Sequence, residues 1–175
     1  MTSRLLIVVD MLIGFCQPDH PLYCGPSSRE IIPGIVSHIE SHYQHNSNEI
    51  LFLVDTHKPN DPEFEMFPPH CIEGTPECLV IPELMPYVTE NNLIPKSRYS
   101  GFFRTDLDSR IKEIDPSCVE VCGVCTQICV FFTVEELRNR FYPTRVLSDL
   151  VASFDSQAHL HALSQMEQVL GAEIV

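Results

Sequence analysis

Several polar side chains stand at or just beyond the ends of short apolar runs. They are Asp10 after residues 5–9, Asp55-Thr56-His57 after residues 50–54, Lys96 after residues 92–95, and Cys129 beyond residues 119–121. A thiol can act as a nucleophile when a carboxylate takes and returns its proton, and a nearby ammonium favours the thiolate. We therefore predict Asp10, Lys96 and Cys129 as a nucleophilic triad.

The position of Cys129 adds to this prediction. The pattern after Cys125 indicates a helix over about residues 126–140, which places Cys129 in its first turn. Unpaired backbone N–H groups and the helix dipole favour an anion there. We expect the pKa of this thiol to be lowered, and more so beside Lys96.

A second group of residues has the character of metal ligands. Asp55 and His57 are two residues apart, and His70 follows Phe67-Pro68-Pro69. Imidazole and carboxylate groups suit a divalent ion such as Zn²⁺, Fe²⁺ or Mn²⁺. Glu63 or Glu65 could supply a further oxygen. The residue types alone leave open whether this site binds a metal, because an Asp-x-His pair is frequent by chance.

A run of four cysteines offers a rival metal site, formed by Cys118, Cys122, Cys125 and Cys129. The spacing matches no standard zinc or iron–sulfur pattern. Residues 118–122 also have the pattern of a strand, which would direct Cys118 and Cys122 into its packing. We therefore set this site aside.

The elements that must position these groups alternate between apolar runs and helical patterns, as in β-α-β units. We predict a three-layer, Rossmann-like α/β domain with a six-stranded parallel sheet flanked by helices. In such sheets ligands bind beyond the carboxyl ends of the strands, so the polar groups above should share one rim. The expected strands are residues 5–9, 50–54, 92–95, 119–121, 145–147 and 173–175, and the expected helices are 29–43, 106–114, 126–140 and 156–170.

The segment at about residues 57–90 interrupts this alternation. It contains seven prolines and has no clear period, so we expect an irregular loop with a short helical turn. Long loops inside a compact domain are uncommon and usually functional. We predict that this loop contributes to the metal and substrate site.

Composition sets the limits of the function. The chain has 175 residues, which predicts one domain over residues 1–175, and its net charge of −13 argues against nucleic acid and anionic membranes as partners. The apolar run at residues 5–9 is far shorter than the ~20 residues of a membrane span. We expect a cytoplasmic protein with mostly reduced cysteines and a small-molecule substrate. A homo-oligomer is compatible with this composition.

The chain resembles the isochorismatase-like cysteine hydrolases, and within them the nicotinamidases. The matching segments occur in family order and span most of the chain. They are Val8-Val9-Asp10 with Phe15, Val54-Asp55-Thr56-His57, Phe67-Pro68-Pro69-His70-Cys71 with Gly74-Thr75, Lys96-Ser97-Arg98-Tyr99-Ser100-Gly101-Phe102, and Gly123-Val124-Cys125-Thr126-Gln127-Ile128-Cys129-Val130. One departure is Gln127, where many relatives have Asp.

The resemblance implies a six-stranded parallel sheet and a triad of Asp10, Lys96 and Cys129. It implies hydrolysis of nicotinamide to nicotinate and ammonia through a thioester on the cysteine, a reaction of NAD salvage. The backbone N–H groups of Cys125 and Cys129 would hold the oxyanion. Family members also carry a cis peptide before the residue that matches Cys125.

The resemblance also implies one divalent metal ion that positions the pyridine nitrogen, with zinc favoured over iron or manganese. Asp55, His57 and His70 match ligand positions, and we favour Glu63 over Glu65 as the fourth ligand. The expected walls of the ring pocket are Phe15, Phe67 and Tyr99, whereas core packing is the better interpretation of Phe102.

Two other hypotheses stay open. The first is another cysteine hydrolase of the same fold that acts on a different small amide or on isochorismate, and a protein without stoichiometric metal would favour it. The second is a non-catalytic metal-binding or redox-thiol protein that uses the cysteine-rich stretch, which requires a Cys129 thiol of ordinary reactivity.

Overall fold

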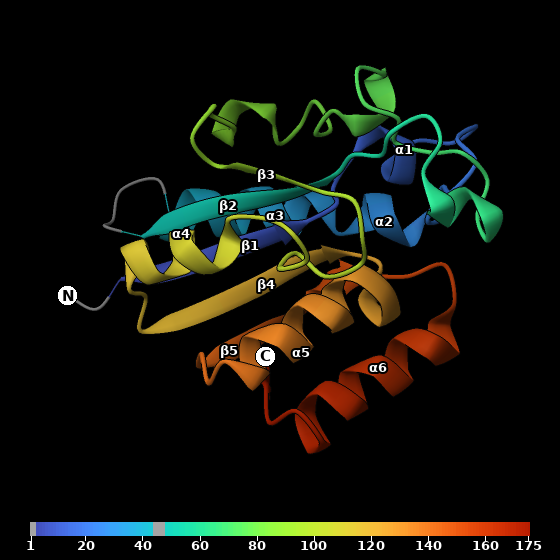
Figure 1. The fold of residues 1–175 in the computed structure, drawn as a ribbon. Helices are drawn as coiled ribbons and strands as arrows, with labels where there is room; N and C mark the ends of the chain where they lie inside the picture. Colours follow the sequence, from blue (N-terminus) through green and yellow to red (C-terminus); the bar gives the residue numbers. More distant parts are fainter. Residues whose placement is uncertain (1–2, 44–47) are drawn as a thin grey trace.

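The protein is built around a six-stranded parallel sheet, as predicted. The computed structural model describes residues 3–43 and 48–175 (Figure 1). The strand order is β3-β2-β1-β4-β5-β6, and every neighbouring pair is parallel. The strands are β1 (Arg4–Val9), β2 (Glu49–Asp55), β3 (Leu93–Lys96), β4 (Cys118–Val124), β5 (Thr144–Ala152) and β6 (Glu173–Ile174).

Helices cover both faces of the sheet, which explains why its central strands are almost purely apolar. On one face, Leu6 and Val8 of β1 pack in a core cluster with residues of α3 (Ile32–His42). On the other face, Leu5, Ile7 and Val9 pack with residues of α4 (Leu107–Ile114), α5 (Phe131–Asn139) and α6 (Ser156–Gln168). The result is three layers, with the sheet between two layers of helices (Figure 1).

Two predicted helices are each divided into two parts. Residues 29–43 form the end of α2 (Ser27–Glu30) and then α3, because Pro33 has no N–H to donate to the preceding turn. Residues 126–140 begin with a π-helical turn, η4 (Thr126–Val130), before α5. The Val130 N–H donates to the Cys125 carbonyl, five residues earlier, at 3.3 Å. Such π-helical turns occur frequently at functional sites.

The proline-rich segment at residues 57–90 contains more local structure than the one turn expected. It has three short 3₁₀ turns, η1 (Pro62–Glu65), η2 (Pro76–Cys78) and η3 (Met85–Tyr87), and each has a proline near its start. The segment runs along the β3 side of the sheet and beside α1 (Ile13–Cys16) (Figure 1). Buried Ile81 and Leu84 attach it to the core.

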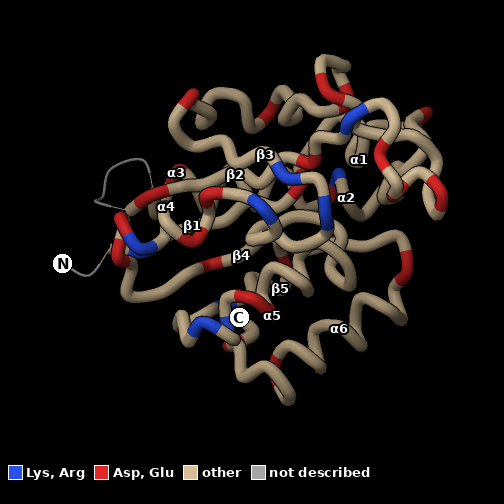
Figure 2. The backbone as a smooth tube through the Cα atoms, viewed as in Figure 1, with Lys and Arg blue, Asp and Glu red and all other residues tan. Residues whose placement is uncertain are grey.

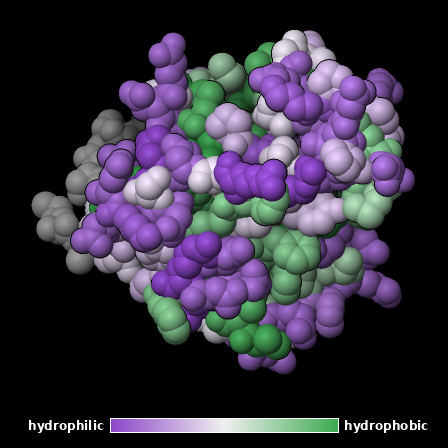
Figure 3. Space-filling view, in the orientation of Figure 1, coloured by the Kyte–Doolittle hydropathy of each residue, from purple (hydrophilic) through white to green (hydrophobic). Residues whose placement is uncertain are grey.

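The surface is largely hydrophilic on the face shown in Figure 3, with smaller hydrophobic areas between the polar residues. Acidic positions are spread along the described chain rather than gathered in one segment (Figure 2). Within residues 3–43 and 48–175, no helix has the length and apolar character that a membrane span requires.

Candidate active site

The carboxyl ends of four neighbouring strands form the rim of the candidate site. The register pairs Asp55 with Lys96 at the ends of β2 and β3, and it pairs Val9 with Gly123 at the ends of β1 and β4. Asp10 therefore follows β1 beside Asp55, and its carboxylate accepts the Asp55 N–H at 3.1 Å. This is the rim predicted from the order of the apolar runs.

Lys96 lies at the centre of the group. Its buried Nζ is 2.8 Å from Asp10 Oδ2, 3.1 Å from Asp55 Oδ1 and 3.6 Å from Cys129 Sγ. The three residues predicted as a triad are thus in contact through one ammonium. The arrangement is consistent with a triad of nucleophile, base and cation.

The electrostatic state of the site follows from its burial. Burial raises the pKa of Asp10 to about 6, although Lys96 acts in the opposite direction. For Lys96, burial lowers the pKa, but the charges of Asp10 and Asp55 outweigh it and raise the pKa well above its usual value. Asp10 can therefore exchange a proton near neutral pH while Lys96 stays charged.

The expectation of a lowered pKa for Cys129 is wrong. The thiol lies in the π-helical turn η4, ahead of the first turn of α5. Burial raises its pKa well above the usual value, the charge of Lys96 opposes this rise, and the charges of Asp10 and Asp55 add to it. The resting group is therefore a thiol, and a base must remove its proton before it can attack.

Cys125 occupies the short connection between β4 and η4. The Val124–Cys125 peptide is cis, as the family resemblance implied. The backbone of Cys125 and that of Cys129 therefore belong to one tight turn at the end of β4. Their role as oxyanion donors stays a prediction. The thiols of Cys125 and Cys24 lie 2.8 Å apart, and both residues line the cavity beside this turn.

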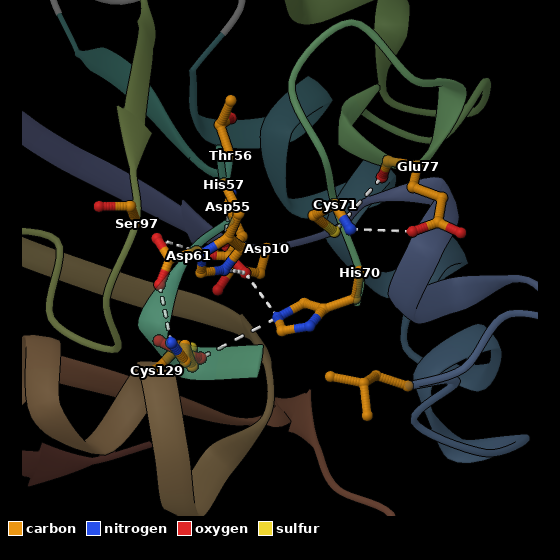
Figure 4. Close-up of polar contacts among 12 residues, drawn as sticks. Asp10, Asp55, Thr56, His57, Asp61, His70, Cys71, Glu77, Ser97 and Cys129 are labelled. Atoms are coloured by element: carbon orange, nitrogen blue, oxygen red, sulfur yellow. Dashed lines mark hydrogen bonds and ion pairs between the residues drawn. The ribbon is translucent and has the colours of Figure 1, made fainter. Parts of the chain in front are cut away.

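The second predicted group is also assembled next to Lys96. His57 Nε2 is 2.9 Å from Asp55 Oδ2, and His70 Nε2 is 3.4 Å from the same oxygen. A parallel bridge between His57 and Ile72 fixes the loop so that His70 reaches across to His57. Figure 4 shows Asp10, Asp55, His57 and Asp61 close together, with His70 pointing toward them from the loop.

The donor set fits a divalent metal ion. The ligand atoms of Asp55, His57 and His70 all lie within 4.8 Å of one another, and all three residues are buried. His70 Nδ1 lies 2.8 Å from the Pro68 carbonyl, an acceptor only, so Nδ1 carries the proton and Nε2 can present a lone pair to the cluster. Among the described residues, the groups that could hold a metal include no cysteine, in line with the rejection of the four-cysteine site.

Two carboxylates of the loop, those of Glu63 and Asp61, approach this cluster. Glu63 is buried, with Oε1 4.0 Å from His70 Nε2, whereas Glu65 is exposed. Asp61 was not predicted, yet its Oδ2 lies 3.2 Å from His57 Nδ1. Its position four residues after His57 and just before Pro62, at the start of a turn, could have indicated it.

A cavity of about 330 Å³ opens onto both groups. Phe15, Phe67 and Tyr99 line it. Phe102 instead packs against the core cluster that contains Val9. The guanidinium carbon of Arg140 lies over the Phe102 ring, 4.3 Å from the ring centre. The rings of Phe67 and Tyr99 meet edge to face at 6.5 Å. The apolar walls suit a flat aromatic molecule.

Further wall residues that were not predicted include Leu22, Tyr23, Cys24 and Phe154. Phe154 follows β5 at the same rim, so the strand-end rule could have identified it. Residues 22–24 lie in irregular chain between α1 and α2, where the sequence pattern gives no comparable signal.

Comparisons with known proteins agree with this geometry. The family model described as Isochorismatase domain matches residues 4–174. An isochorismatase family protein of Bacillus subtilis, PncA, is 32% identical over 181 residues, covering 98% of each chain. The crystal structure of nicotinamidase/pyrazinamidase PncA from Bacillus subtilis superposes with a TM-score of 0.91 at 31% identity, covering 99% of both chains. The pyrazinamidase of Pyrococcus horikoshii in complex with zinc superposes with a TM-score of 0.88 at 28% identity, covering 98% of both.

Proposed function

The chain belongs to the isochorismatase family of hydrolases, and from this premise we propose that it is a nicotinamidase, which hydrolyses nicotinamide to nicotinate and ammonia. The observation that carries the proposal is the shared cavity. The Cys129 thiol and the Asp10 carboxylate form one part of its wall, and Lys96 contacts both of them. Asp55, Glu63 and His70 form another part, and His57 completes that cluster next to Asp55. Nucleophile and metal-ligand donors therefore face the same apolar space.

In the first half of the proposed reaction, Asp10 removes the proton of the Cys129 thiol. The thiolate attacks the carbonyl carbon of the amide, and the backbone N–H groups of Cys125 and Cys129 stabilise the oxyanion. Asp10 then returns the proton to the leaving nitrogen, and ammonia departs. Its pKa of about 6 suits both transfers.

In the second half, a water molecule attacks the thioester on Cys129. Asp10 again takes a proton and returns it to the sulfur as nicotinate leaves. Lys96 keeps its charge throughout, because two carboxylates hold its pKa high. Its Nζ lies 3.6 Å from the sulfur, close enough to stabilise negative charge on it.

Asp55, His57, Glu63 and His70 would hold a divalent metal ion, for which zinc is our first expectation. When bound, the ion would supply a coordination position for the pyridine nitrogen of the substrate. Phe15, Phe67 and Tyr99 would confine the flat ring. The zinc complex of the Pyrococcus horikoshii relative supports this choice of metal.

The test is ammonia release from nicotinamide by the purified protein, measured before and after chelation. We expect turnover that chelation removes and that added Zn²⁺, Fe²⁺ or Mn²⁺ restores. Benzamide is the matched control substrate, since it has the same amide and ring size but no ring nitrogen. It should be hydrolysed far more slowly.

Two results would contradict the proposal. Absence of nicotinamide turnover with all three cations would point to another small amide or to isochorismate. Equal turnover of benzamide and nicotinamide would contradict a role for the ring nitrogen.

A further inference from the structure

We infer that Asp61 and Arg98 form a positioning pair that orients His57 and Glu63 toward the metal. The pair also attaches the metal loop, which is the segment at residues 57–70, to the strand of Lys96. The inference rests on the metal site of the proposed function. It concerns two residues that are not themselves proposed as ligands. Neither of them lines the cavity, and the carboxylate of Asp61 lies with His57 and Glu63 in a second group of donor atoms within 4.8 Å of one another.

Asp61 makes three kinds of contact. Its Oδ1 accepts the backbone N–H of Glu63 at 2.9 Å, and its Oδ2 lies 3.2 Å from His57 Nδ1. Both oxygens accept from Arg98 Nη1, at 2.9 and 3.0 Å. One carboxylate therefore contacts a proposed histidine ligand and the backbone of a proposed glutamate ligand.

Carboxylate oxygens face both ring nitrogens of His57: Asp55 Oδ2 lies 2.9 Å from Nε2, and Asp61 Oδ2 lies 3.2 Å from Nδ1. With Nε2 turned to a metal ion, the proton would be on Nδ1, the nitrogen that faces Asp61. Metal-bound histidines commonly donate their second N–H to such a carboxylate, which fixes the ring orientation and strengthens the ligand. Asp61 is the described carboxylate in this position, because the Asp55 oxygen contacts the other nitrogen.

Arg98 supplies the opposing charge. Its Nη1 lies 3.8 Å from Glu63 Oε2 in addition to its contact with Asp61. The guanidinium therefore lies between the carboxylate of Asp61 and that of Glu63, and it holds the two side chains on the same side of the loop.

Arg98 also connects two segments that are distant in the chain. It stands two residues after Lys96, while Asp61 stands in the loop that carries His57 and Glu63. The ion pair thus fixes the metal loop relative to the end of β3. A shift of this loop would move His57 away from Asp55.

The experiment measures zinc affinity in the absence of substrate, by competition with a chromophoric chelator. Asp61→Asn removes the charge and weakens the acceptor at Nδ1, and we expect zinc affinity to fall about 10–100-fold. Arg98→Gln should lower the affinity in the same direction. Arg98→Lys keeps the charge and should restore part of the loss.

The matched control is Glu173→Gln. Glu173 accepts two hydrogen bonds from Arg145 at 3.0 Å each, at the β5–β6 edge, and this pair resembles Asp61–Arg98 without touching the cluster. Its loss should leave zinc affinity unchanged. A double variant, Asp61→Asn with Arg98→Gln, should lose no more affinity than Asp61→Asn alone if the two residues act as a unit.

The outcomes separate this inference from the function on which it rests. Wild-type protein that binds zinc, with Asp61→Asn and Arg98→Gln within twofold of it, would overturn the positioning pair and leave the metal site standing. Wild-type protein that binds no zinc, iron or manganese would overturn both. Circular dichroism checks that each variant is folded. If Asp61→Asn does not fold, the comparison of Arg98→Gln with Arg98→Lys provides the test.

Discussion

Lys96 Nζ lies 3.1 Å from Asp55 Oδ1, although the two residues belong to groups with different proposed tasks. The same ammonium is 2.8 Å from Asp10 Oδ2. One buried cation therefore balances the base of the proposed triad and the first ligand of the proposed metal cluster. Changing its charge should affect both.

Lys96→Met should move the acidic limb of the pH profile of kcat/KM to higher pH. Asp10 must be ionised to act as a base, so activity should rise as the pH increases through about 6 in the wild-type protein. The Lys96 charge lowers the pKa of Asp10, and its removal should shift the limb upward by about 1–3 pH units. Rates of ammonia release across pH, with the metal at saturation, measure this. Lys96→Arg keeps the charge, and its acidic limb should lie near that of the wild-type protein. An acidic limb that does not move in Lys96→Met would contradict the effect of the Lys96 charge on Asp10.

Cys129→Ala should lower the rate of ammonia release by at least about 10³-fold, because it removes the thiol on which the thioester forms in the proposed reaction. Cys118→Ala is the control, since Cys118 is a half-buried thiol of β4 that does not line the cavity. It should keep wild-type turnover. In the wild-type protein, mass spectrometry of the trapped thioester intermediate should find the acyl group of the substrate on Cys129. Substantial turnover in Cys129→Ala would rule out the proposed nucleophile.

Glu63→Gln should weaken zinc binding by at least tenfold, whereas Glu65→Gln should have little effect. The two residues share one 3₁₀ turn, but Glu63 is buried beside His70 and Glu65 is exposed. The two variants therefore compare a buried with an exposed carboxylate in the same short turn. Chelator competition gives both affinities, and equal losses would argue against Glu63 as the ligand.

Glu120→Gln should destabilise the protein by about 3 kcal/mol at pH 7 and flatten its acid unfolding. Glu120 is buried in β4 and accepts hydrogen bonds from Arg4 and Tyr43, with His38 2.9 Å away. Despite the effect of burial, these contacts lower its pKa to about 2. Because the folded-state pKa is below the usual 4.5, the stabilisation is present above that pH and is lost as the pH falls toward 2.

Urea unfolding at pH 7 and near pH 3 measures this effect. The wild-type protein should lose more stability between the two values than Glu120→Gln does. Glu113→Gln, at an exposed position of α4, is the control and should resemble wild type. A variant that loses stability with pH as steeply as wild type would exclude Glu120 as the source.

The order of the elements could be predicted because it depends on local patterns. The apolar run of residues 50–54 in β2 lacks the alternation of a half-exposed strand, which indicated a strand covered on both faces, and both faces are covered. Given a parallel sheet, the carboxyl-end rule brought Asp10, Asp55 and Lys96 to one rim without any knowledge of distances. The break at Pro33 was less visible, because a proline near a helix start is compatible with a continuous helix or with a new one.

The charge state of Cys129 and the partner of His57 depend on groups that are far apart in the chain. A local rule about helix starts predicted a lowered thiol pKa, but burial among Asp10 and Asp55 reverses it. Asp61 meets Arg98 only because the irregular loop folds back over the end of β3. Residue types and periodicity therefore specify the sheet, the rim and its chemistry, since these follow from short-range regularities. Proton affinities and side-chain partners follow from distances across the fold, which no short stretch of sequence encodes.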